Sequence, residues 1–247
     1  MELGLSGRTA VVCGASSGMG LAIAEALAAE GTNVAMFARR RELLEREAER
    51  IGALAVRGDL TNPADLKRLV DRTVEAFGVI DILVNNGGGP PRTPALDITD
   101  ESVEAAVELL LLSAIRLTRL CLPQLERSGR GRVINITSSS VREPIDNLAL
   151  SNSIRPGLIG WAKTLARELG PKKVTVNSIA PGRIETARLA EVYAGQPRAE
   201  DLEQIPLRRF GAPGEVASVV CFLASDAAGY VTSAVIPVDG GLTRSLL

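Results

Sequence analysis

Short runs of apolar, often β-branched residues alternate along the chain with longer segments in which apolar positions recur at helical spacing. The short runs predict strands at residues 9–15, 32–38, 53–59, 80–86, 131–139, 173–182 and 233–241. The periodic segments predict helices at residues 18–30, 41–50, 62–77, 100–127, 153–169 and 213–224. Strands and helices that alternate in this way form right-handed βαβ units. The pattern therefore predicts an α/β fold, a Rossmann-type doubly wound parallel sheet of about seven strands with helices on both faces.

No linker rich in Pro, Gly or Ser and no internal repeat divides the chain, so we expect residues 1–247 to form one domain. One long segment, at about residues 183–212, separates the sixth predicted strand from the last predicted helix. It is polar and contains Pro197 and Pro206. Because connections of this length are uncommon in compact domains unless they have a function, we expect it to be a lid-like insertion.

Composition supports a buried sheet and argues against several classes of function. Hydrophobic residues make up 46% of the 247 residues and aromatic residues only 3%, which is typical of an aliphatic core around a parallel sheet. The net charge of −1 provides no basis for binding nucleic acid or an anionic membrane. No stretch reaches the roughly 18 uncharged apolar residues of a membrane span. We therefore expect a small-molecule substrate and no nucleic-acid or membrane partner.

Cysteine and histidine usage bears on compartment and chemistry. Cys13, Cys121 and Cys221 lie far apart and lack metal-ligand spacing, so we expect reduced, mostly buried thiols in a cytoplasmic protein. Residues 1–7 carry Glu2 and do not resemble a secretory leader. The chain contains no His, which excludes His-based catalytic triads and argues against a transition-metal site, so we expect no metal.

A glycine-rich turn lies where a dinucleotide would bind in this fold. Residues 14–20 read G-A-S-S-G-M-G, follow the first predicted strand and open the first predicted helix. Glycines there permit a tight turn and the close approach of a pyrophosphate to the helix N-terminus, although an ordinary βα turn is the other interpretation. The candidate cofactor-binding residues in this turn are Gly14, Ser16, Ser17, Gly18, Met19 and Gly20.

The end of the second predicted strand distinguishes between the two nicotinamide cofactors. NAD binding usually places an acidic residue there for the ribose 2′-hydroxyl, and the position near Ala38 is not acidic. Arg39 and Arg40 follow instead, and arginine accommodates the 2′-phosphate of NADP. NADP(H) is therefore favoured over NAD(H). A solvated basic turn is the alternative, because the chain uses Arg for nearly all of its 28 basic residues.

Further motifs follow in order along the chain. They are Gly58-Asp59-Leu60-Thr61, Asn85-Asn86-Gly87-Gly88, Ser138 at the end of the fifth predicted strand, the P-G-x-x-x-T segment at 181–186 and Val238-Asp239-Gly240-Gly241. With the glycine turn, they make the chain similar over residues 5–243 to the short-chain dehydrogenase/reductase family, near its 3-oxoacyl-[acyl-carrier-protein] reductase-like branch. The resemblance implies that Asp59 binds the adenine and that the 181–186 segment holds the nicotinamide carboxamide. The further cofactor-binding residues that it implies are Leu60, Asn86, Gly87, Gly88, Arg155, Pro181, Gly182, Ile184 and Thr186.

The resemblance also locates the reaction site. In the family an Asn, a Ser, a Tyr and a Lys perform the chemistry, and Tyr is the general acid/base. In this chain the Ser is Ser138, the Tyr position is Ser151, the Lys position is Arg155 and the Asn position is Leu110. Residues 158–170 match the family helix without a gap, which fixes this register. The candidate catalytic residues are therefore Ser138, Ser151 and Arg155.

These replacements change what the site can do with a proton. Arg155 keeps a positive charge and can bind ribose hydroxyls, but its pKa is too high for proton transfer. Ser151 is a far weaker acid than a phenol and is shorter by a ring. Leu110 cannot hold a water relay, and we expect it to be buried in its helix.

Other residues could deliver the proton. Tyr193 lies in the 183–212 segment and could be carried over the nicotinamide by a lid. Glu143 and Asp146 lie in the loop before Ser151, where the alternative interpretation is a solvated loop.

Pro156 affects where the helix that carries Arg155 should begin. Proline is tolerated in the first turn of a helix, and Ser151 to Ser153 are good capping residues. We therefore expect this helix to begin near Ser153, with Arg155 close to its positive end.

The sequence is compatible with two functions. One is an NADP(H)-dependent oxidoreductase for a small carbonyl, hydroxyl or acyl substrate, with non-standard proton delivery. The other is a nicotinamide-nucleotide-binding protein with little or no redox activity and a regulatory or scaffold role. The resemblance further implies that the helices at 100–127 and 153–169 pair between subunits in a homotetramer or homodimer. Leu109 to Leu112 and Trp161 would supply apolar surface for that contact.

Overall fold

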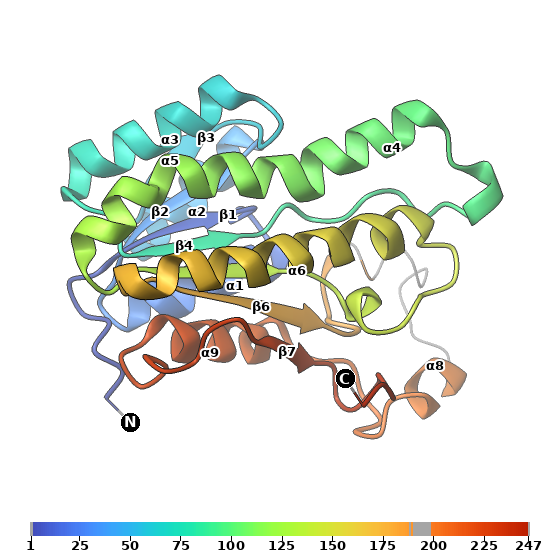
Figure 1. Cartoon of the computed structure of the whole chain (residues 1–247). Coiled ribbons are helices and arrows are strands. Elements are labelled where there is room, and N and C mark those ends of the chain that lie inside the picture. The colour runs from blue at the N-terminus through green and yellow to red at the C-terminus, as the bar shows by residue number, and fades with distance from the viewer. Residues whose placement is uncertain (1, 188, 190–198, 247) are drawn as a thin grey trace.

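The computed structural model describes residues 2–187, 189 and 199–246. Its centre is a parallel sheet of seven strands in the order β3-β2-β1-β4-β5-β6-β7 (Figure 1). The strands are β1 Thr9–Cys13, β2 Asn33–Ala38, β3 Leu54–Arg57, β4 Ile82–Asn85, β5 Arg132–Ile136, β6 Thr175–Pro181 and β7 Val235–Val238. The predicted fold class and all seven predicted strands are confirmed.

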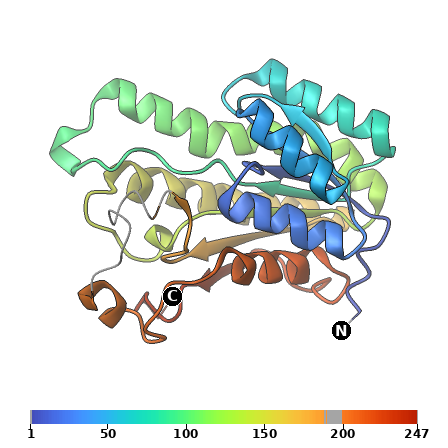
Figure 2. The same ribbon diagram turned by 180° about the vertical axis from the view of Figure 1, so that it is seen from behind.

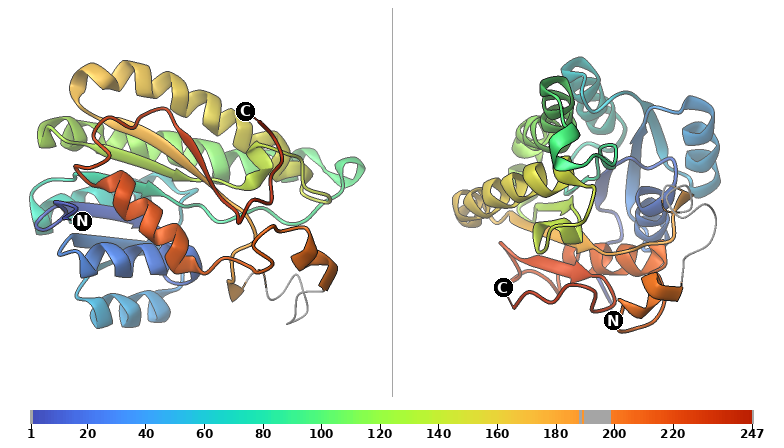
Figure 3. Two further views of the ribbon diagram at one scale, coloured as in Figure 1. Left: turned by 90° about the horizontal axis from the view of Figure 1, so that it is seen from below. Right: turned by 90° about the vertical axis from the view of Figure 1, so that its right-hand side faces the viewer.

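Helices cover both faces of the sheet, as the end-on view in Figure 3 shows. One face is covered by α1 Gly18–Ala29, α2 Arg41–Ile51 and α9 Pro213–Ala224 (Figure 2). The other face is covered by α3 Pro63–Phe77, α5 Ser113–Ser128 and α6 Ala149–Leu169. Successive residues of β1 alternate between these two cores, since Ala10 and Val12 belong to one and Val11 and Cys13 to the other. The sheet is therefore buried on both sides.

Strand order reverses between β1 and β4, because the chain winds outward to β3 before it crosses back. In open α/β sheets, ligands bind in the crevice beyond the carboxyl ends of the strands at such a switch point. Several connections project beyond those ends, including the segment with the short helix α8 Ala199–Glu203 (Figure 1). Residues 188 and 190–198, with Tyr193 and Pro197, lie outside the described residues.

The helix predicted at 100–127 is divided by a π-helical turn. It consists of α4 Asp100–Val107, the turn η2 Glu108–Leu112 and α5 Ser113–Ser128. Leu110 lies in the middle of η2 and is 4% exposed, which confirms the prediction that it is buried. Pi-turns are often found at functional sites, and this one faces the ends of β4 and β5.

The predicted start of α6 near Ser153 is wrong, because the helix begins at Ala149. The Ala149 amide donates to the Thr93 carbonyl at 3.2 Å, and Thr93 pairs with Leu148 in an isolated parallel bridge. The Asn152 side chain also bonds both the amide and the carbonyl of Ile145. These contacts hold the first turn in place, so Pro156 lies inside the helix and Arg155 is more than one turn from its N-terminus.

All three cysteines are buried and free of disulfides, as predicted. Burial raises the pKa of the Cys13 thiol to about 12 and that of Cys221 to about 11, so both thiols are neutral at physiological pH. No described helix combines the length and the apolar character that crossing a bilayer requires.

Candidate functional site

The glycine turn packs closely against the end of β4. Gly14 has a φ of +61°, and a Cβ on it would lie 2.6 Å from the Asn86 carbonyl oxygen. A Cβ on Gly20 would lie 2.2 Å from the Gly14 carbonyl oxygen. The Asn86 side chain donates to the Cys13 carbonyl at 3.2 Å, which fixes the end of β1 to the end of β4. Glycine is therefore required at 14 by its backbone angle and at 20 by its surroundings.

Arg40 lies over the serines of that turn. Its guanidinium donates to the Ser16 hydroxyl at 3.2 Å and to the Ser17 hydroxyl at 2.5 Å. Arg39 points into solvent, with its side chain 80% exposed, and comes within 3.9 Å of the Asp59 carboxylate. No acidic residue occupies the first turn of α1. This corner of the molecule thus presents a helix N-terminus, two hydroxyls and two guanidinium groups, a combination that suits an anion.

The segment that follows β6 contacts the same turn from the other side. A Cβ on Gly18, whose φ is +58°, would lie 3.3 Å from Thr186 Cγ2. A Cβ on Gly182 would lie 2.7 Å from that of Asp239, so the beginning of this segment also packs on the chain after β7. Ile184 pairs with Gly211 in an isolated bridge, which closes the neck of the 183–212 segment.

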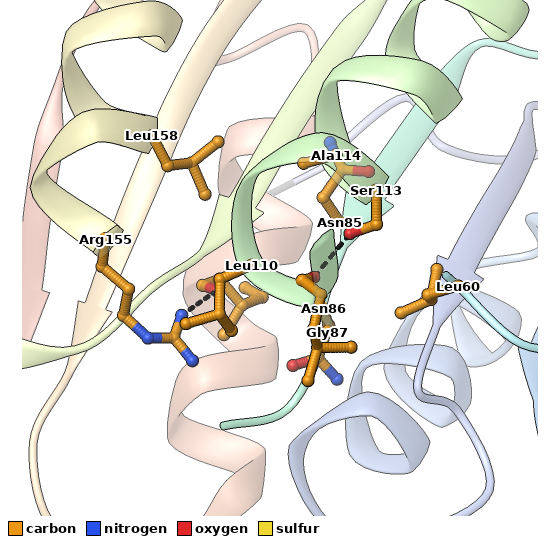
Figure 4. A pocket seen from close by; sticks show the side chains of 11 residues that line it. Leu60, Asn85, Asn86, Gly87, Leu110, Ser113, Ala114, Arg155 and Leu158 are labelled. Atoms are coloured by element: carbon orange, nitrogen blue, oxygen red, sulfur yellow. Dashed lines mark hydrogen bonds between the residues drawn. The ribbon is translucent and has the colours of Figure 1, made fainter. Parts of the chain in front are cut away.

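A small hollow lies between the loop after β4, the π-helical turn and α6 (Figure 4). Its lining is Leu60, Asn85, Asn86, Gly87, Leu109, Leu110, Ser113, Ala114, Ile136, Arg155 and Leu158. Figure 4 shows Arg155 from α6 and Leu110 from η2 approaching one another across it. The hollow therefore joins the predicted cofactor-binding loop to two of the four positions that the resemblance assigns to catalysis.

Arg155 is 6% exposed and connects the ends of two strands. Its guanidinium donates to the Ile136 carbonyl at the end of β5, at 3.2 Å, and to the Gly88 carbonyl in the loop after β4. These bonds place a fixed positive charge beside the hollow. Because the guanidinium remains protonated, this charge is permanent.

The serines of the site form a short hydrogen-bonded series. Ser138 is half-buried and begins the 3₁₀ turn η3 Ser139–Val141, where its hydroxyl accepts the Ser140 amide at 3.1 Å. The Ser140 hydroxyl lies 3.0 Å from the Ser151 hydroxyl, and both residues are 4% exposed. Ser151 is thus paired with Ser140. Sequence reasoning did not select Ser140, whose only signal was its place in the Ser138-Ser139-Ser140 run.

The alternative proton donors in the preceding loop have other neighbours. The Glu143 carboxylate accepts the Arg244 amide near the C-terminus. Asp146 is exposed, and its main-chain carbonyl accepts the Arg92 guanidinium. Tyr193 belongs to the residues that the structure leaves undescribed.

Sequence comparison gives the family of the chain. A family model described as enoyl-(acyl carrier protein) reductase matches residues 14–243. The 3-oxoacyl-[acyl-carrier-protein] reductase FabG of Escherichia coli is 35% identical over 244 residues, which cover 97% of this chain and 99% of the relative. An uncharacterised short-chain type dehydrogenase/reductase of Sinorhizobium fredii is 33% identical over 248 residues, covering 96% and 98%. This chain belongs to the short-chain dehydrogenase/reductase family.

Solved structures agree with this assignment to the short-chain dehydrogenases/reductases. L-sorbose reductase of Gluconobacter frateurii, solved with NADPH and L-sorbose, superposes with a TM-score of 0.92 at 33% identity and covers 100% of both chains. YwfH, an NADPH-dependent reductase of bacilysin biosynthesis, superposes with a TM-score of 0.93 at 27% identity, covering 97% of this chain and 99% of its own. The chain is an oxidoreductase of the short-chain type.

Proposed function

We propose that this chain is an NADP(H)-dependent oxidoreductase that interconverts a carbonyl and a hydroxyl group, like the 3-oxoacyl reductases, with proton delivery that uses no Tyr–Lys pair. The observation that carries the proposal is the intact nucleotide corner, where the glycine turn, Asn86 and Arg40 meet at the switch point of the sheet. The small-molecule substrate would carry a carbonyl or an acyl group, as the names of the relatives suggest.

The residues present fit a nicotinamide dinucleotide. The positive φ angles of Gly14 and Gly18 shape a turn without side chains, so a pyrophosphate can approach the N-terminus of α1. Met19 and Gly20 lie in the first turn of that helix, and Gly87 and Gly88 lie in the loop after β4. Asp59 and Leu60 would bind on the adenine side. Pro181, Gly182, Ile184 and Thr186 would hold the nicotinamide carboxamide. Arg40, with Ser16 and Ser17, would bind the 2′-phosphate.

Replacement of Arg40 tests the preference for NADP(H). Arg40→Ala removes the cation that bridges both serines, so we expect the Kd for NADPH to rise about tenfold or more and the Kd for NADH to change little. Arg41→Ala is the matched control, because Arg41 is exposed and pairs with Glu45 on its own helix. Fluorescence titration measures both constants. Equal loss of affinity for the two cofactors would contradict the proposal.

At the reaction end, each residue has a role set by its contacts. The cofactor, when bound, supplies hydride chemistry. Ser138 would donate a hydrogen bond to the substrate oxygen, and the fixed charge of Arg155 would favour the negative charge that develops there. Because neither group releases a proton at neutral pH, water would supply the proton that completes the hydroxyl.

A broad panel of ketones and 3-oxoacyl thioesters tests for turnover. We expect NADPH oxidation with at least one member of the panel. NADPH binding without oxidation across the whole panel would refute the proposed activity.

A second function is favoured by the pairing of Ser151 with Ser140 and by the replacement of Lys with Arg155. A nucleotide-binding protein with little redox activity, in a regulatory or scaffold role, would tolerate both. Under that function the double variant Ser151→Tyr/Arg155→Lys should gain reductase activity from an inactive parent. An active parent would refute it.

The 183–212 segment would act as a lid on a single domain of residues 1–247. Its neck, where Ile184 pairs with Gly211, would be the hinge region.

The chain would assemble as a homotetramer or homodimer. The half-exposed Trp161 on α6 and the half-exposed Leu109 on η2 would pack between the subunits. Light scattering that gave the mass of one chain would contradict the assembly.

A further inference from the structure

We propose that Ser140 and Ser151 form a buried hydroxyl pair that positions Ser138, and that Ser151 supports the reaction site without donating a proton. The position that holds the general acid elsewhere in the family would then be a supporting position in this chain. This inference rests on the proposed oxidoreductase activity.

The Ser138 hydroxyl is free to donate its hydrogen toward a substrate. A serine hydroxyl has one hydrogen to donate and two lone pairs with which to accept. Ser138 uses a lone pair to accept the Ser140 amide at 3.1 Å, so its own hydrogen is not spent on that bond. On the other side, Thr137 bonds the Ile179 carbonyl through both its amide and its hydroxyl, at 2.8 and 2.6 Å. Ser138 is therefore held between β6 and η3 and keeps a hydrogen for a substrate oxygen.

A buried pair of serine hydroxyls holds η3 in place. Ser140 is 4% exposed, and its hydroxyl pairs with Ser151 Oγ at 3.0 Å. Ser151 lies in the first turn of α6, whose start is fixed by the bond from Ala149 to Thr93. Through this pair the long helix α6 is joined to the turn that Ser138 begins. A shift of Ser140 would move the amide that orients the Ser138 hydroxyl.

The neighbours of Ser151 make it a poor proton donor. Its hydroxyl is engaged with a second serine hydroxyl of the same intrinsic acidity, so the pair contains no gradient of pKa that would drive a proton outward. Arg155, one helical turn further along α6, stays protonated at neutral pH and so cannot act as an acid. The described contacts of Ser151 thus suit a positioning residue.

A double-mutant cycle on the full-length, NADPH-loaded protein tests the inference. The variants are Ser140→Ala, Ser151→Ala and both together, and Ser153→Ala, an exposed serine of the same helix, is the matched control. Ser140→Ala removes the hydroxyl and leaves the main-chain amide that donates a hydrogen bond to the Ser138 hydroxyl. The readouts are kcat and KM for a carbonyl that the wild type reduces, NADPH affinity, and the urea midpoint of unfolding.

We expect each single variant to lower kcat about tenfold with a smaller change in KM, and the double variant to match the single variants within about twofold. Ser138→Ala, which removes the presented donor, should lower kcat about 10²–10³-fold with NADPH affinity retained. A loss of 10²-fold or more in Ser151→Ala, with no loss in Ser140→Ala, would identify Ser151 as the acid and overturn the inference. Multiplying effects in the double variant would also overturn it.

Failure of the proposed oxidoreductase activity can be distinguished from failure of the inference about Ser140 and Ser151. If the wild type reduces nothing in the panel, the activity proposal fails, and the unfolding cycle decides the inference. If the two single variants shift the urea midpoint additively, the hydroxyl pair is refuted. If the double variant is no less stable than the less stable single variant, the pair is supported.

Discussion

Gly87 shows how one missing side chain sets the distance between two backbone segments. A Cβ at this position would lie 2.9 Å from the Leu109 carbonyl oxygen in the π-helical turn. That oxygen also accepts the Ser113 hydroxyl at 2.6 Å, so it is not free to move. The chain therefore brings η2 close enough to the loop after β4 to require Gly at this position.

We expect Gly87→Ala to lower the free energy of unfolding by about 1–3 kcal/mol, because the added methyl group displaces backbone rather than a flexible side chain. Gly214→Ala is the matched control, since nothing lies within 4 Å of the added Cβ in the first turn of α9. That change should stabilise the protein by about 0.4–1 kcal/mol. Urea unfolding measures both, and equal effects would contradict the close approach at Gly87.

At the scale of single residues, sequence reasoning was sufficient where a chemical pattern is local. The structure brings the glycine turn and Arg40 together as expected, because strand, turn and helix follow one another directly. The sequence alone could not identify Ser140, because its role depends on a partner eleven residues later. Nor could it show that Arg155 bonds two main-chain carbonyls, one of them 67 residues away.

At the scale of elements, α6 shows why helix boundaries depend on distant contacts. Pro156 suggests a late start, but the helix begins at Ala149. The partner that fixes this start is Thr93, which belongs to a different connection. Local propensity disfavours Pro inside a helix, and the tertiary contacts of the first turn outweigh that preference.

Asn152 provides a direct test of this explanation. Its side chain accepts the Ile145 amide at 3.1 Å and donates to the Ile145 carbonyl at 2.9 Å. Asn152→Ala leaves both groups without these partners, so we expect a loss of about 1–3 kcal/mol in unfolding free energy. Hydrogen exchange should also quicken in the first turn of α6 and not in its last.

The matched control is Ser153→Ala, because Ser153 is the exposed neighbour in the same turn. It should change the free energy of unfolding by less than about 0.5 kcal/mol. If the two variants unfold at the same urea concentration, the anchoring role of Asn152 is refuted.

At the scale of the whole molecule, the alternation of strands and helices was enough to predict the parallel sheet and its two layers. A right-handed crossover leaves few ways to arrange βαβ units, so topology follows from the pattern. The π-helical turn was not predictable in this way, because the run Leu109 to Leu112 carries no Gly or Pro to mark it. In the folded chain, Leu109 of this turn packs against Gly87 of the loop after β4.

Glu215 joins the 183–212 segment to α9 and makes the stability of the molecule depend on pH. Hydrogen bonds from Arg209 and from the Ala212 amide lower the pKa of this carboxyl to about 2, from an ordinary value of 4.5. Its stabilising contribution is therefore complete above pH 4.5 and is lost as the pH falls toward 2. Urea midpoints measured from pH 6 down should fall more steeply for the wild type than for Glu215→Gln below about pH 4.5. Parallel curves would contradict this role.

An ion pair between a buried arginine and an exposed aspartate joins the start of the sheet to the chain after α9, and this affects how the protein can fold during synthesis. Arg8, at the start of β1, is fully buried and donates to the Ala224 carbonyl at 2.9 Å and to the Asp226 carboxylate. A buried guanidinium without its acceptors is costly. While the ribosome has not yet synthesised α9, the first strand cannot complete its burial. We therefore expect the sheet to complete its packing only after residue 226 has emerged from the ribosome, so that the apolar β1 strand is exposed to aggregation until then.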